Sequence, residues 1–333
     1  PSLQQQQPPL VPGESRSFTA RQCCGILANA MLGNVVDVMA ERKDNKGGLS
    51  FIRHLRFPEG VYIHKTAALL VYFERRRQAM GTDDERVVTF EYLACPTEDE
   101  FEQILSQRGD AQLAGDVTNG RVCTLHADVM EAVTAADAFV NFANENFGYG
   151  CFIPSCTQEE ILQLCCPEFN VGMLLLGKMG DGEVVNVTGC RRYSRYSGYL
   201  DEYRCEGPWP SDTIATILTL DACTHEHFSK AKLLRDVCKA YTSFKALVAA
   251  ARSDHKAPVV STGRWGCGVF RGVPTHKFLQ QVLAASLAGV TLRFSTFGQA
   301  DGCDTLLESV RRTSMRAHEA WKLLCSCDSQ EAF

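Results

Sequence analysis

The residues of this chain best suited to chemistry are two adjacent glutamates within Thr157-Gln158-Glu159-Glu160. Carboxyl groups act as general acids and bases when a fold holds them against a substrate. Ile161, Leu164 and Cys165 follow at helical spacing and Pro167 ends the run, so we expect the motif to begin a helix. Because Thr-x-x-Glu is also a capping box, a purely structural role stays open at this point.

A glycine turn precedes this helix. A predicted strand ends at Asn144, and Phe147-Gly148-Tyr149-Gly150 follows it. A strand that leads through a glycine turn to a helix N-terminus is typical of anion-binding sites, because backbone N–H groups converge there. This context favours a functional role for the two glutamates.

A second glycine-rich loop spans Ser261–Gly272, with four glycines from Gly263 onward. Glycines at this density indicate positive φ angles or a close approach of the backbone to a ligand. A helix is expected to begin near Thr275, so the segment is a second candidate phosphate loop. An ordinary turn packed around Trp265 explains the pattern equally well.

Three other clusters have a structural interpretation at least as good as a functional one. The tyrosines within Tyr193–Tyr199 either stack on a base or occupy a β-turn. Arg75-Arg76-Arg77 is either an anion patch or a solvated helix end. The run Cys223–His227 contains metal-ligand residue types without metal-ligand spacing, so we expect no metal there.

Composition is typical of a soluble globular protein. Of 333 residues, 45% are apolar and 22% charged, and no run of about 18 apolar residues indicates a membrane span. The Gln- and Pro-rich residues 1–15 are expected to form a disordered tail and not a secretory signal. The 16 cysteines lie mostly in apolar runs, which favours reduced thiols in the nucleus or cytoplasm. With a formal net charge of -5, the chain would have to bind a polyanion through local groups.

The pattern of apolar residues predicts an α/β fold. Residues 16–117 are predicted to be mainly helical with a short strand at 87–90, and residues 118–333 to alternate strands and helices. The predicted strands lie at 122–126, 138–142, 172–176, 183–187, 214–220 and 290–294. The predicted helices lie at 158–166, 229–251, 275–288 and 303–325. In such folds ligands bind beyond the strand ends.

In their order along the chain, these motifs resemble the poly(ADP-ribose) glycohydrolase family. The family signature is a triple-glycine loop followed by Gln-Glu-Glu. Here Phe142-Ala143-Asn144, the glycine turn and seven further residues lead to Gln158-Glu159-Glu160. The resemblance continues through Tyr196-Ser-Gly-Tyr199, Thr262–Gly268 and Thr296-Phe297-Gly298, and spans about residues 17 to 325.

The resemblance implies a macrodomain-like mixed sheet flanked by helices at residues 118–333, with residues 16–117 as a mainly helical accessory region. It implies hydrolysis of ribose–ribose O-glycosidic bonds in poly(ADP-ribose), with release of ADP-ribose. Glu160 would be the general acid/base, with Glu159 and Asn141 as further catalytic residues. The residues implied to bind substrate are Gln158, Asn144, Glu131, Gly148, Tyr149, Gly150, Tyr199, Gly266, Cys267, Gly268 and Phe297.

Particular parts of the ligand follow from the same resemblance. Glu131 would bind adenine, and the backbone at Gly148–Gly150 and Gly266–Gly268 would cradle the diphosphate. The implied partners are poly(ADP-ribose) or ADP-ribosylated proteins, in the context of the DNA damage response. We expect a monomer with no cofactor, no metal, no membrane association and no direct DNA binding.

Three positions depart from the family pattern. Asn141 stands where the family has an aspartate, Tyr149 replaces the middle glycine of the first loop, and Arg264 replaces an asparagine. An amide at 141 can still accept a hydrogen bond, and Arg264 can add a charge-assisted bond to phosphate. The departures leave two alternatives open, a non-catalytic ADP-ribose reader and a hydrolase for another ADP-ribosyl linkage.

Overall fold

The protein is described here by a computed structural model that covers residues 9–35, 49–56, 59–113, 123–148, 154–251, 256–299 and 301–329. Its helices are α1 (Ala20–Leu32), α2 (Ile52–Arg56), α3 (Val61–Gln78), α4 (Glu98–Arg108), α5 (Gln158–Cys165), α6 (Lys230–Ala250), α7 (Pro274–Ala288), α8 (Cys303–Arg312) and α9 (Ala317–Ser326). Short 3₁₀ helices are η2 (Met130–Ala132), η4 (Pro167–Leu174) and η5 (Leu200–Glu202). The strands are β1 (Ser15–Thr19), β2 (Val87–Ala94), β3 (Thr124–His126), β4 (Ala138–Ala143), β5 (Glu183–Arg191), β6 (Ser194–Ser197), β7 (Arg204–Pro208), β8 (Ile214–Asp221), β9 (Val259–Gly263) and β10 (Thr291–Ser295).

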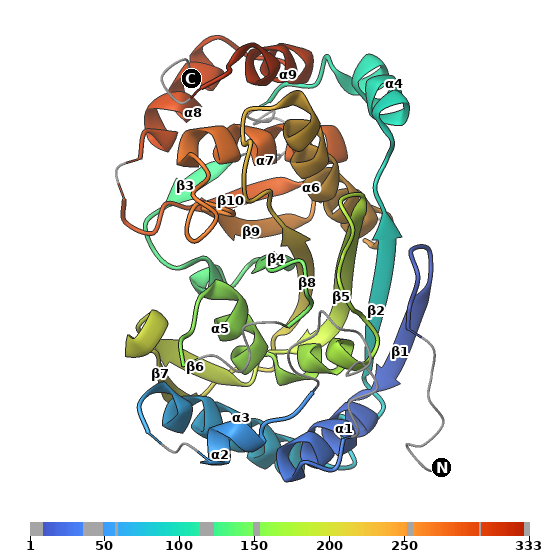
Figure 1. The fold of residues 1–333 in the computed structure, drawn as a ribbon, viewed down its shortest axis with the longest axis vertical. Helices are drawn as coiled ribbons and strands as arrows, with labels where there is room; N and C mark the ends of the chain where they lie inside the picture. The colour runs from blue at the N-terminus through green and yellow to red at the C-terminus, as the bar shows by residue number, and fades with distance from the viewer. Residues whose placement is uncertain are drawn as a thin grey trace. The chain divides into compact units, whose positions relative to one another are not determined.

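Among these described residues, a mixed sheet of eight strands has the order β1-β2-β5-β8-β4-β9-β10-β3, and β6 and β7 form a separate pair (Figure 1). The β1–β2 pair is antiparallel, whereas β4, β9, β10 and β3 pair in parallel. Helices separate the parallel strands along the chain, as crossover connections require. The predicted α/β class with a mixed sheet flanked by helices is confirmed.

The chain divides into two compact units, each made of three separate segments. The first unit consists of Pro1–Tyr92, Ala143–Gly180 and Asn186–Ile217, and the second of Leu93–Phe142, Asp181–Val185 and Leu218–Phe333. This division does not follow the predicted boundary between residues 117 and 118. A separate accessory function for residues 16–117 therefore stays a prediction.

The first unit begins before the predicted end of the N-terminal tail. Leu10 is buried, and its N–H donates to the Leu175 carbonyl over 2.9 Å. The N–H of Gly13 donates to the Tyr92 carbonyl over 2.7 Å, just before β1 begins. An apolar side chain and backbone hydrogen bonds thus hold described residues between 9 and 15, whereas residues 1–8 of the predicted tail lie outside the described residues.

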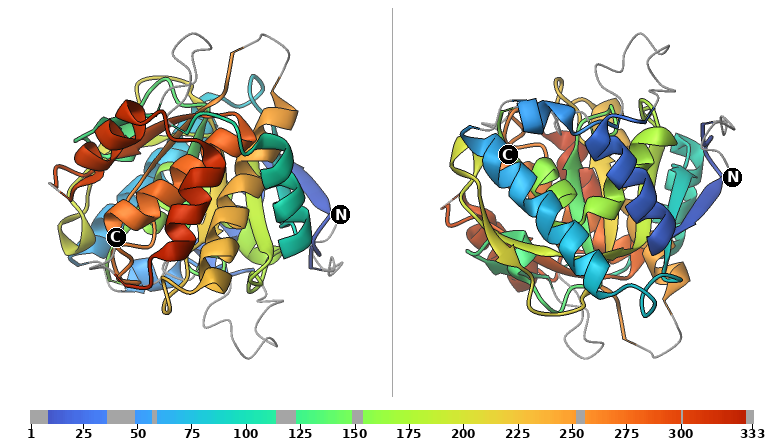
Figure 2. Two further views of the ribbon diagram at one scale, coloured as in Figure 1. Left: turned by 90° about the horizontal axis from the view of Figure 1, so that it is seen from above. Right: turned by 90° about the horizontal axis from the view of Figure 1, so that it is seen from below.

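Helices α1, α2 and α3 belong to the first unit, and α2 contacts both of the others (Figures 1 and 2). Helix α1 starts at Thr19, whose hydroxyl accepts from the Gln22 N–H while the Gln22 side chain accepts from the Thr19 N–H. It ends at Gly33, where φ is +74° and a Cβ would lie 1.9 Å from Ile52. Both ends of α1 are thus set by local residue types.

One predicted strand of the first unit is wrong. Residues 172–176 were expected to form a strand, but η4 runs through Pro167–Leu174 and packs against α1. A short apolar run buried on all sides has no alternation to distinguish a strand from a helix. Pro167 at the first position of η4 suits a helical turn.

The second unit has its core between the parallel strands and helices α6, α7 and α9. Helix α7 packs against α6, α8 and α9, which lie together in the left panel of Figure 2. Its buried face carries Phe278, Leu279, Val282 and Leu283, as predicted for a helix at 275–288. The predicted helix at 303–325 is interrupted between α8 and α9, where Ser314 has a φ of +50°. Helical periodicity alone does not reveal such a break.

No helix among the described residues has the length and apolar character needed to cross a membrane.

Candidate active site

The predicted catalytic motif forms the first turn of α5, in the first unit. Thr157 precedes the helix, and its N–H and hydroxyl donate to the Glu160 carboxylate over 2.7 and 2.6 Å. Both bonds end on Oε2, and neither uses Oε1. Glu160 is only 3% exposed. The capping box is therefore formed, and it fixes one of the two carboxylate oxygens of Glu160.

Glu159 points to a different partner. Its Oε2 accepts from the N–H of Asn144 over 3.0 Å, so α5 is tied to the residue that follows β4. Glu159 is 4% exposed and Gln158 8% exposed. A buried carboxylate is costly unless hydrogen bonds compensate its charge, and here both glutamates have such bonds. The adjacent side chains thus diverge, as their separation of about 100° around a helix requires.

The turn after β4 is braced by its own residues. The Asn144 side-chain oxygen accepts from the backbone N–H and the side-chain amide of Asn146, over 2.9 and 3.1 Å. Gly148 has a φ of +74°, and a Cβ there would lie 2.7 Å from Met173. Glycine is therefore required at 148 by packing and by backbone conformation. Tyr149 and Gly150 lie outside the described residues.

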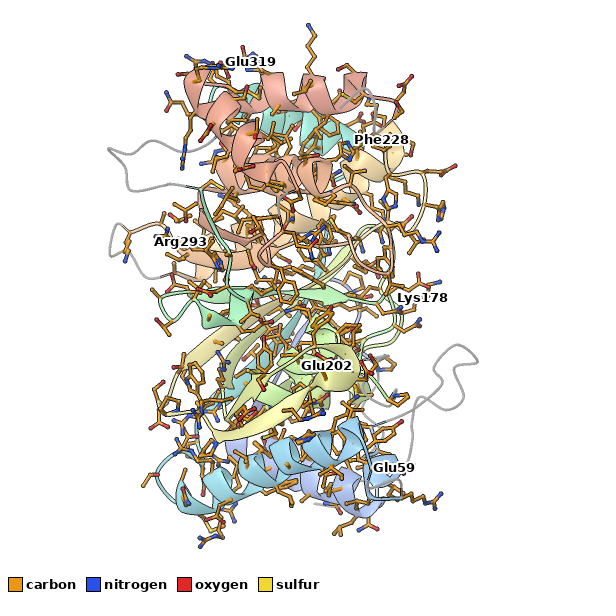
Figure 3. The ribbon with its side chains drawn as sticks, turned by 90° about the vertical axis from the view of Figure 1, so that its left-hand side faces the viewer. Glu59, Lys178, Glu202, Phe228, Arg293 and Glu319 are labelled. Atoms are coloured by element: carbon orange, nitrogen blue, oxygen red, sulfur yellow. The ribbon has the colours of Figure 1, made fainter. Side chains whose placement is uncertain are left out.

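The loop that carries Tyr199 is joined to the segment before α5. Cys156 and Leu200 exchange two backbone hydrogen bonds of 3.0 and 2.8 Å. Gly198 has a φ of +74°, and a Cβ there would lie 2.1 Å from the Glu202 carbonyl oxygen. Figure 3 labels Glu202 in this turn. Tyr199 is 37% exposed, so its ring is accessible close to the start of the motif.

In the second unit, Glu131 lies in η2 and is 4% exposed. The segment Asp128–Met130 at the start of this short helix is held by one serine within β9 and one at the end of β10. The Ser261 hydroxyl donates to the Met130 carbonyl over 2.7 Å, and the Ser295 hydroxyl donates to the Asp128 carbonyl over 2.6 Å. Asn141 is fully buried within β4. The parallel strands β3, β9 and β10 therefore position Glu131 at their carboxyl ends.

The second glycine loop follows β9 directly. Gly266 has a φ of +74°, and a Cβ there would lie 2.6 Å from the Ala222 Cβ. A Cβ on Gly268 would meet no described atom within 4 Å. Burial raises the pKa of Cys267 to about 12, so its thiol is neutral. Packing thus explains the glycine at 266, whereas no contact with the described residues explains the one at 268.

Two further positions flank this loop. The Arg264 Nε lies 3.4 Å from a carboxylate oxygen of Asp301, so part of its charge is compensated within the protein. Phe297 follows β10 with a φ of +54° and is 46% exposed. Its N–H donates to the Ser295 hydroxyl over 3.2 Å. A contact between Phe297 and a ligand stays a prediction.

No group of three or more His, Cys, Asp or Glu side chains in the described part of the chain is arranged to hold a metal ion. Within the run Cys223–His227, the Cys223 Sγ lies 3.2 Å from His227 Nδ1. The His227 Nε2 lies 2.8 Å from the Phe270 carbonyl oxygen. Both ring nitrogens of His227 thus have protein partners. The sequence had no signal for this contact, because Phe270 lies in another part of the chain.

Parallel strands whose carboxyl ends carry glycine loops, together with a buried Gln-Glu-Glu turn, define a macrodomain-type α/β protein. A family model described as poly(ADP-ribose) glycohydrolase (PARG), macro domain fold, matches residues 115–304. Because this match covers more than half of the chain, the chain belongs to the poly(ADP-ribose) glycohydrolase family.

Relatives in sequence include two proteins of Caenorhabditis elegans. The chain is 28% identical to poly(ADP-ribose) glycohydrolase 1 over 325 residues, which cover 90% of this chain and 38% of the relative. It is 30% identical to poly(ADP-ribose) glycohydrolase 2 over 219 residues, which cover 58% of this chain and 44% of the relative. A probable poly(ADP-ribose) glycohydrolase 2 of Arabidopsis thaliana is 26% identical, with 84% of this chain and 61% of the relative covered. The chain thus spans less than two thirds of each relative.

Similar solved structures include two bacterial poly(ADP-ribose) glycohydrolases. The Thermomonospora curvata structure has a TM-score of 0.45 at 14% identity and covers 75% of this chain and 99% of its own. The Deinococcus radiodurans structure in complex with ADP-ribose has a TM-score of 0.42 at 16% identity, with coverages of 67% and 93%. At this level of similarity the two structures add nothing to the family assignment.

Proposed function

We propose that this chain hydrolyses ribose–ribose O-glycosidic bonds of poly(ADP-ribose) and releases ADP-ribose, with Glu160 as the general acid/base. Family membership supports this activity, and the relatives in Caenorhabditis elegans are named poly(ADP-ribose) glycohydrolases. The observation that carries the role of Glu160 is its one-sided anchoring. Thr157 binds only Oε2, so Oε1 is the oxygen available for proton transfer.

The proposed chemistry needs two proton transfers by one group. Cleavage of the bond passes through an oxocarbenium-like state, and an acid must protonate the departing ribose oxygen. The resulting carboxylate then takes a proton from the water that attacks the sugar. Because Oε2 stays bound to Thr157 in both steps, Oε1 keeps one orientation while it gains and loses the proton. This is the preorganisation that efficient proton transfer requires.

The remaining predicted residues would bind the ligand. Glu159 and Asn144 would hold ribose hydroxyl groups, Gln158 would be a further substrate-binding residue, and Asn141 a further catalytic residue. The loop at Gly266–Gly268 would receive the diphosphate on its backbone N–H groups, as would Gly148–Gly150. The other ligand contacts would be Glu131 at the adenine and the aromatic rings of Tyr199 and Phe297.

We propose that the substrate is poly(ADP-ribose) or an ADP-ribosylated protein and that the protein acts as a monomer without direct DNA binding. The nucleus, the cytoplasm or both would be its compartment, consistent with cysteines that are free thiols throughout the described residues. Nothing in the geometry favours a non-catalytic reader, because both glutamates of the motif are present and anchored.

The test is release of free ADP-ribose from purified poly(ADP-ribose) by the wild type and by Glu160→Gln. We expect turnover by the wild type and a loss of about 10²- to 10⁴-fold in the variant. ADP-ribose binding, measured by calorimetry, should survive in both, because glutamine retains an acceptor for the Thr157 N–H. Binding without turnover in the wild type would instead identify a reader.

A further inference from the structure

The second glycine loop packs against two other segments of the protein. Trp265 is 1% exposed, and its indole N–H donates to the Leu220 carbonyl at the end of β8 over 2.9 Å. The Lys277 ammonium lies 5.2 Å from the centre of the Trp265 ring. The Lys277 stem also lies beneath two loop glycines, since a Cβ on Gly266 or Gly272 would be 3.4 or 3.0 Å from its Cε. The underside of the loop is therefore packed against α7 and the end of β8.

A chain of polar contacts runs from the interior to this loop. The Lys277 ammonium donates to the Asp236 carboxylate and, over 3.4 Å, to the Cys223 sulfur. The Cys223 sulfur lies 3.2 Å from His227 Nδ1. The His227 Nε2 lies 2.8 Å from the Phe270 carbonyl oxygen in the loop. Asp236, Lys277 and Cys223 are buried and His227 is half-buried.

The direction of each hydrogen bond in this series of contacts is determined by the two groups that it joins. A carbonyl oxygen only accepts, so His227 Nε2 must carry a proton and donate to Phe270. Burial and the Lys277 charge lower the pKa of His227, which keeps the ring neutral and leaves Nδ1 as an acceptor. Burial, together with Asp236, raises the pKa of Cys223 to about 11, so a thiol proton is present to donate to Nδ1. The sulfur accepts from Lys277 in turn.

At the buried end of this series of contacts, Asp236 is held by oppositely charged side chains. Asp236 also accepts from the Arg235 guanidinium over 2.7 Å and from the Cys223 N–H over 3.1 Å. Burial alone would raise the pKa of Asp236, but Lys277 and Arg235 hold it below its ordinary value. Phe228, labelled in Figure 3, covers the neighbouring His276 with ring centres 4.5 Å apart. A paired charge with several hydrogen bonds is a rigid anchor, because breaking it would leave a buried ion uncompensated.

We propose that Lys277, Cys223 and His227 are positioning residues that hold the glycine loop in the conformation that binds a diphosphate. We call these three residues the clamp. The identity of the ligand rests on the proposed function, but the contacts of the clamp with the loop do not. The Phe270 carbonyl is bound from below, and the loop is closed by N–H bonds from Cys267 to Arg264 and from Gly272 to Gly266, over 3.0 and 2.8 Å. Loss of the Cys223 thiol would interrupt the series of contacts between the Asp236–Lys277 ion pair and the loop.

The clamp is tested without ligand by hydrogen exchange at residues 266–272. In Cys223→Ala we expect the loop amides to exchange about tenfold faster, the effect of losing one buried hydrogen bond. Cys223→Ser keeps a donor and an acceptor and should stay within about threefold of the wild type. Cys238→Ala, a buried cysteine of α6 outside the chain of contacts, is the matched control and should leave the loop unchanged. The proposal is overturned if the loop amides of Cys223→Ala exchange as slowly as those of the wild type. It is also overturned if Cys223→Ser and Cys238→Ala exchange as fast as Cys223→Ala.

The diphosphate role is tested by calorimetry with two probes, ADP-ribose and adenosine. Cys223→Ala should bind ADP-ribose about tenfold more weakly and adenosine unchanged, because only ADP-ribose has a diphosphate for the loop. Equal losses for both probes would show general damage and overturn the positioning role. If the wild type binds neither probe, the proposed function fails, and the exchange data alone decide whether the clamp exists.

A second pair of variants covers the case in which Cys223→Ala does not fold. His227→Phe keeps the ring shape but cannot donate to Phe270, whereas His227→Gln keeps an N–H donor at a similar distance. We expect faster loop exchange in the phenylalanine variant and partial rescue in the glutamine variant. The same exchange in both variants as in the wild type would overturn the contribution of His227.

Discussion

The first turns of α4 and α5 have the same local structure in different surroundings. In Thr97–Glu100 the glutamate Oε2 accepts from the threonine N–H and hydroxyl over 2.8 and 3.0 Å. In Thr157–Glu160 the corresponding distances are 2.7 and 2.6 Å. The α4 turn is exposed, whereas Gln158, Glu159 and Glu160 are all buried.

The difference shows that a capping box does not by itself separate a structural turn from a candidate catalytic one. Acidic residues in an exposed first turn are stabilised by the helix dipole and by water, which explains α4. Burial of two carboxylates has no such explanation. The additional bond from Asn144 to Glu159 is the feature that α4 lacks.

The largest expected difference is between Glu160→Gln and Glu100→Gln. The first should reduce turnover of poly(ADP-ribose) by about 10²- to 10⁴-fold, since it removes the proposed proton donor. The second makes the same substitution at the cap of an exposed turn, where glutamine can still accept from Thr97, and should leave turnover within about twofold of the wild type. Initial rates of ADP-ribose release measure both. A similar loss in the two variants would contradict proton transfer by Glu160.

Thr157→Val and Thr97→Val sharpen the comparison at the anchoring residue. In Thr157→Val, only the backbone N–H of residue 157 still donates to Glu160 Oε2, so one bond holds the carboxylate instead of two. We expect kcat to fall about tenfold with ADP-ribose affinity retained. Thr157→Ser should restore kcat. Thr97→Val should lower the melting temperature without changing kcat, because it removes only a cap. A wild-type kcat in Thr157→Val would contradict the anchoring role of the hydroxyl.

Two glycines of the loop after β9 allow a similar comparison, between a residue needed for the fold and a residue proposed to contact the ligand. Gly266→Ala should destabilise the fold, by about 1–2 kcal/mol from the positive φ alone, with a further cost from the Cβ of Ala222. Gly268→Ala meets no described atom and should keep the melting temperature while weakening ADP-ribose binding several-fold. Thermal unfolding and calorimetry distinguish the two. Unchanged affinity in Gly268→Ala would remove that residue from the diphosphate site.

The smallest expected effect is the pH dependence of the α4 box. Hydrogen bonds from the backbone and the hydroxyl of Thr97 lower the pKa of Glu100 from its ordinary value of 4.5. Its stabilising contribution is therefore complete above that value and is lost as the pH falls through the lowered pKa. The melting temperature of the wild type should exceed that of Glu100→Gln at neutral pH, and the gap should close in acid. A gap that is independent of pH would show that charge does not contribute.

Local residue types were sufficient for several elements. Helices α6 and α7 lie within a residue or so of their predicted positions, because Ser229, Pro274 and Gly289 mark their ends. The strand expected at 172–176 and the continuous helix at 303–325 were wrong. In both cases tertiary packing or a single backbone angle decided the outcome, and periodicity reports neither.

The sequence by itself determined the turns, caps and order of motifs, since these depend on residues three or four positions apart. Only the tertiary structure decided that Glu159 meets Asn144, that Glu160 is buried, and that Lys277 lies between Asp236 and Cys223. The last three residues come from α7, from α6 and from the segment that follows β8. Their contact depends on how strands and helices pack, and packing is a property of the whole core and not of any short segment.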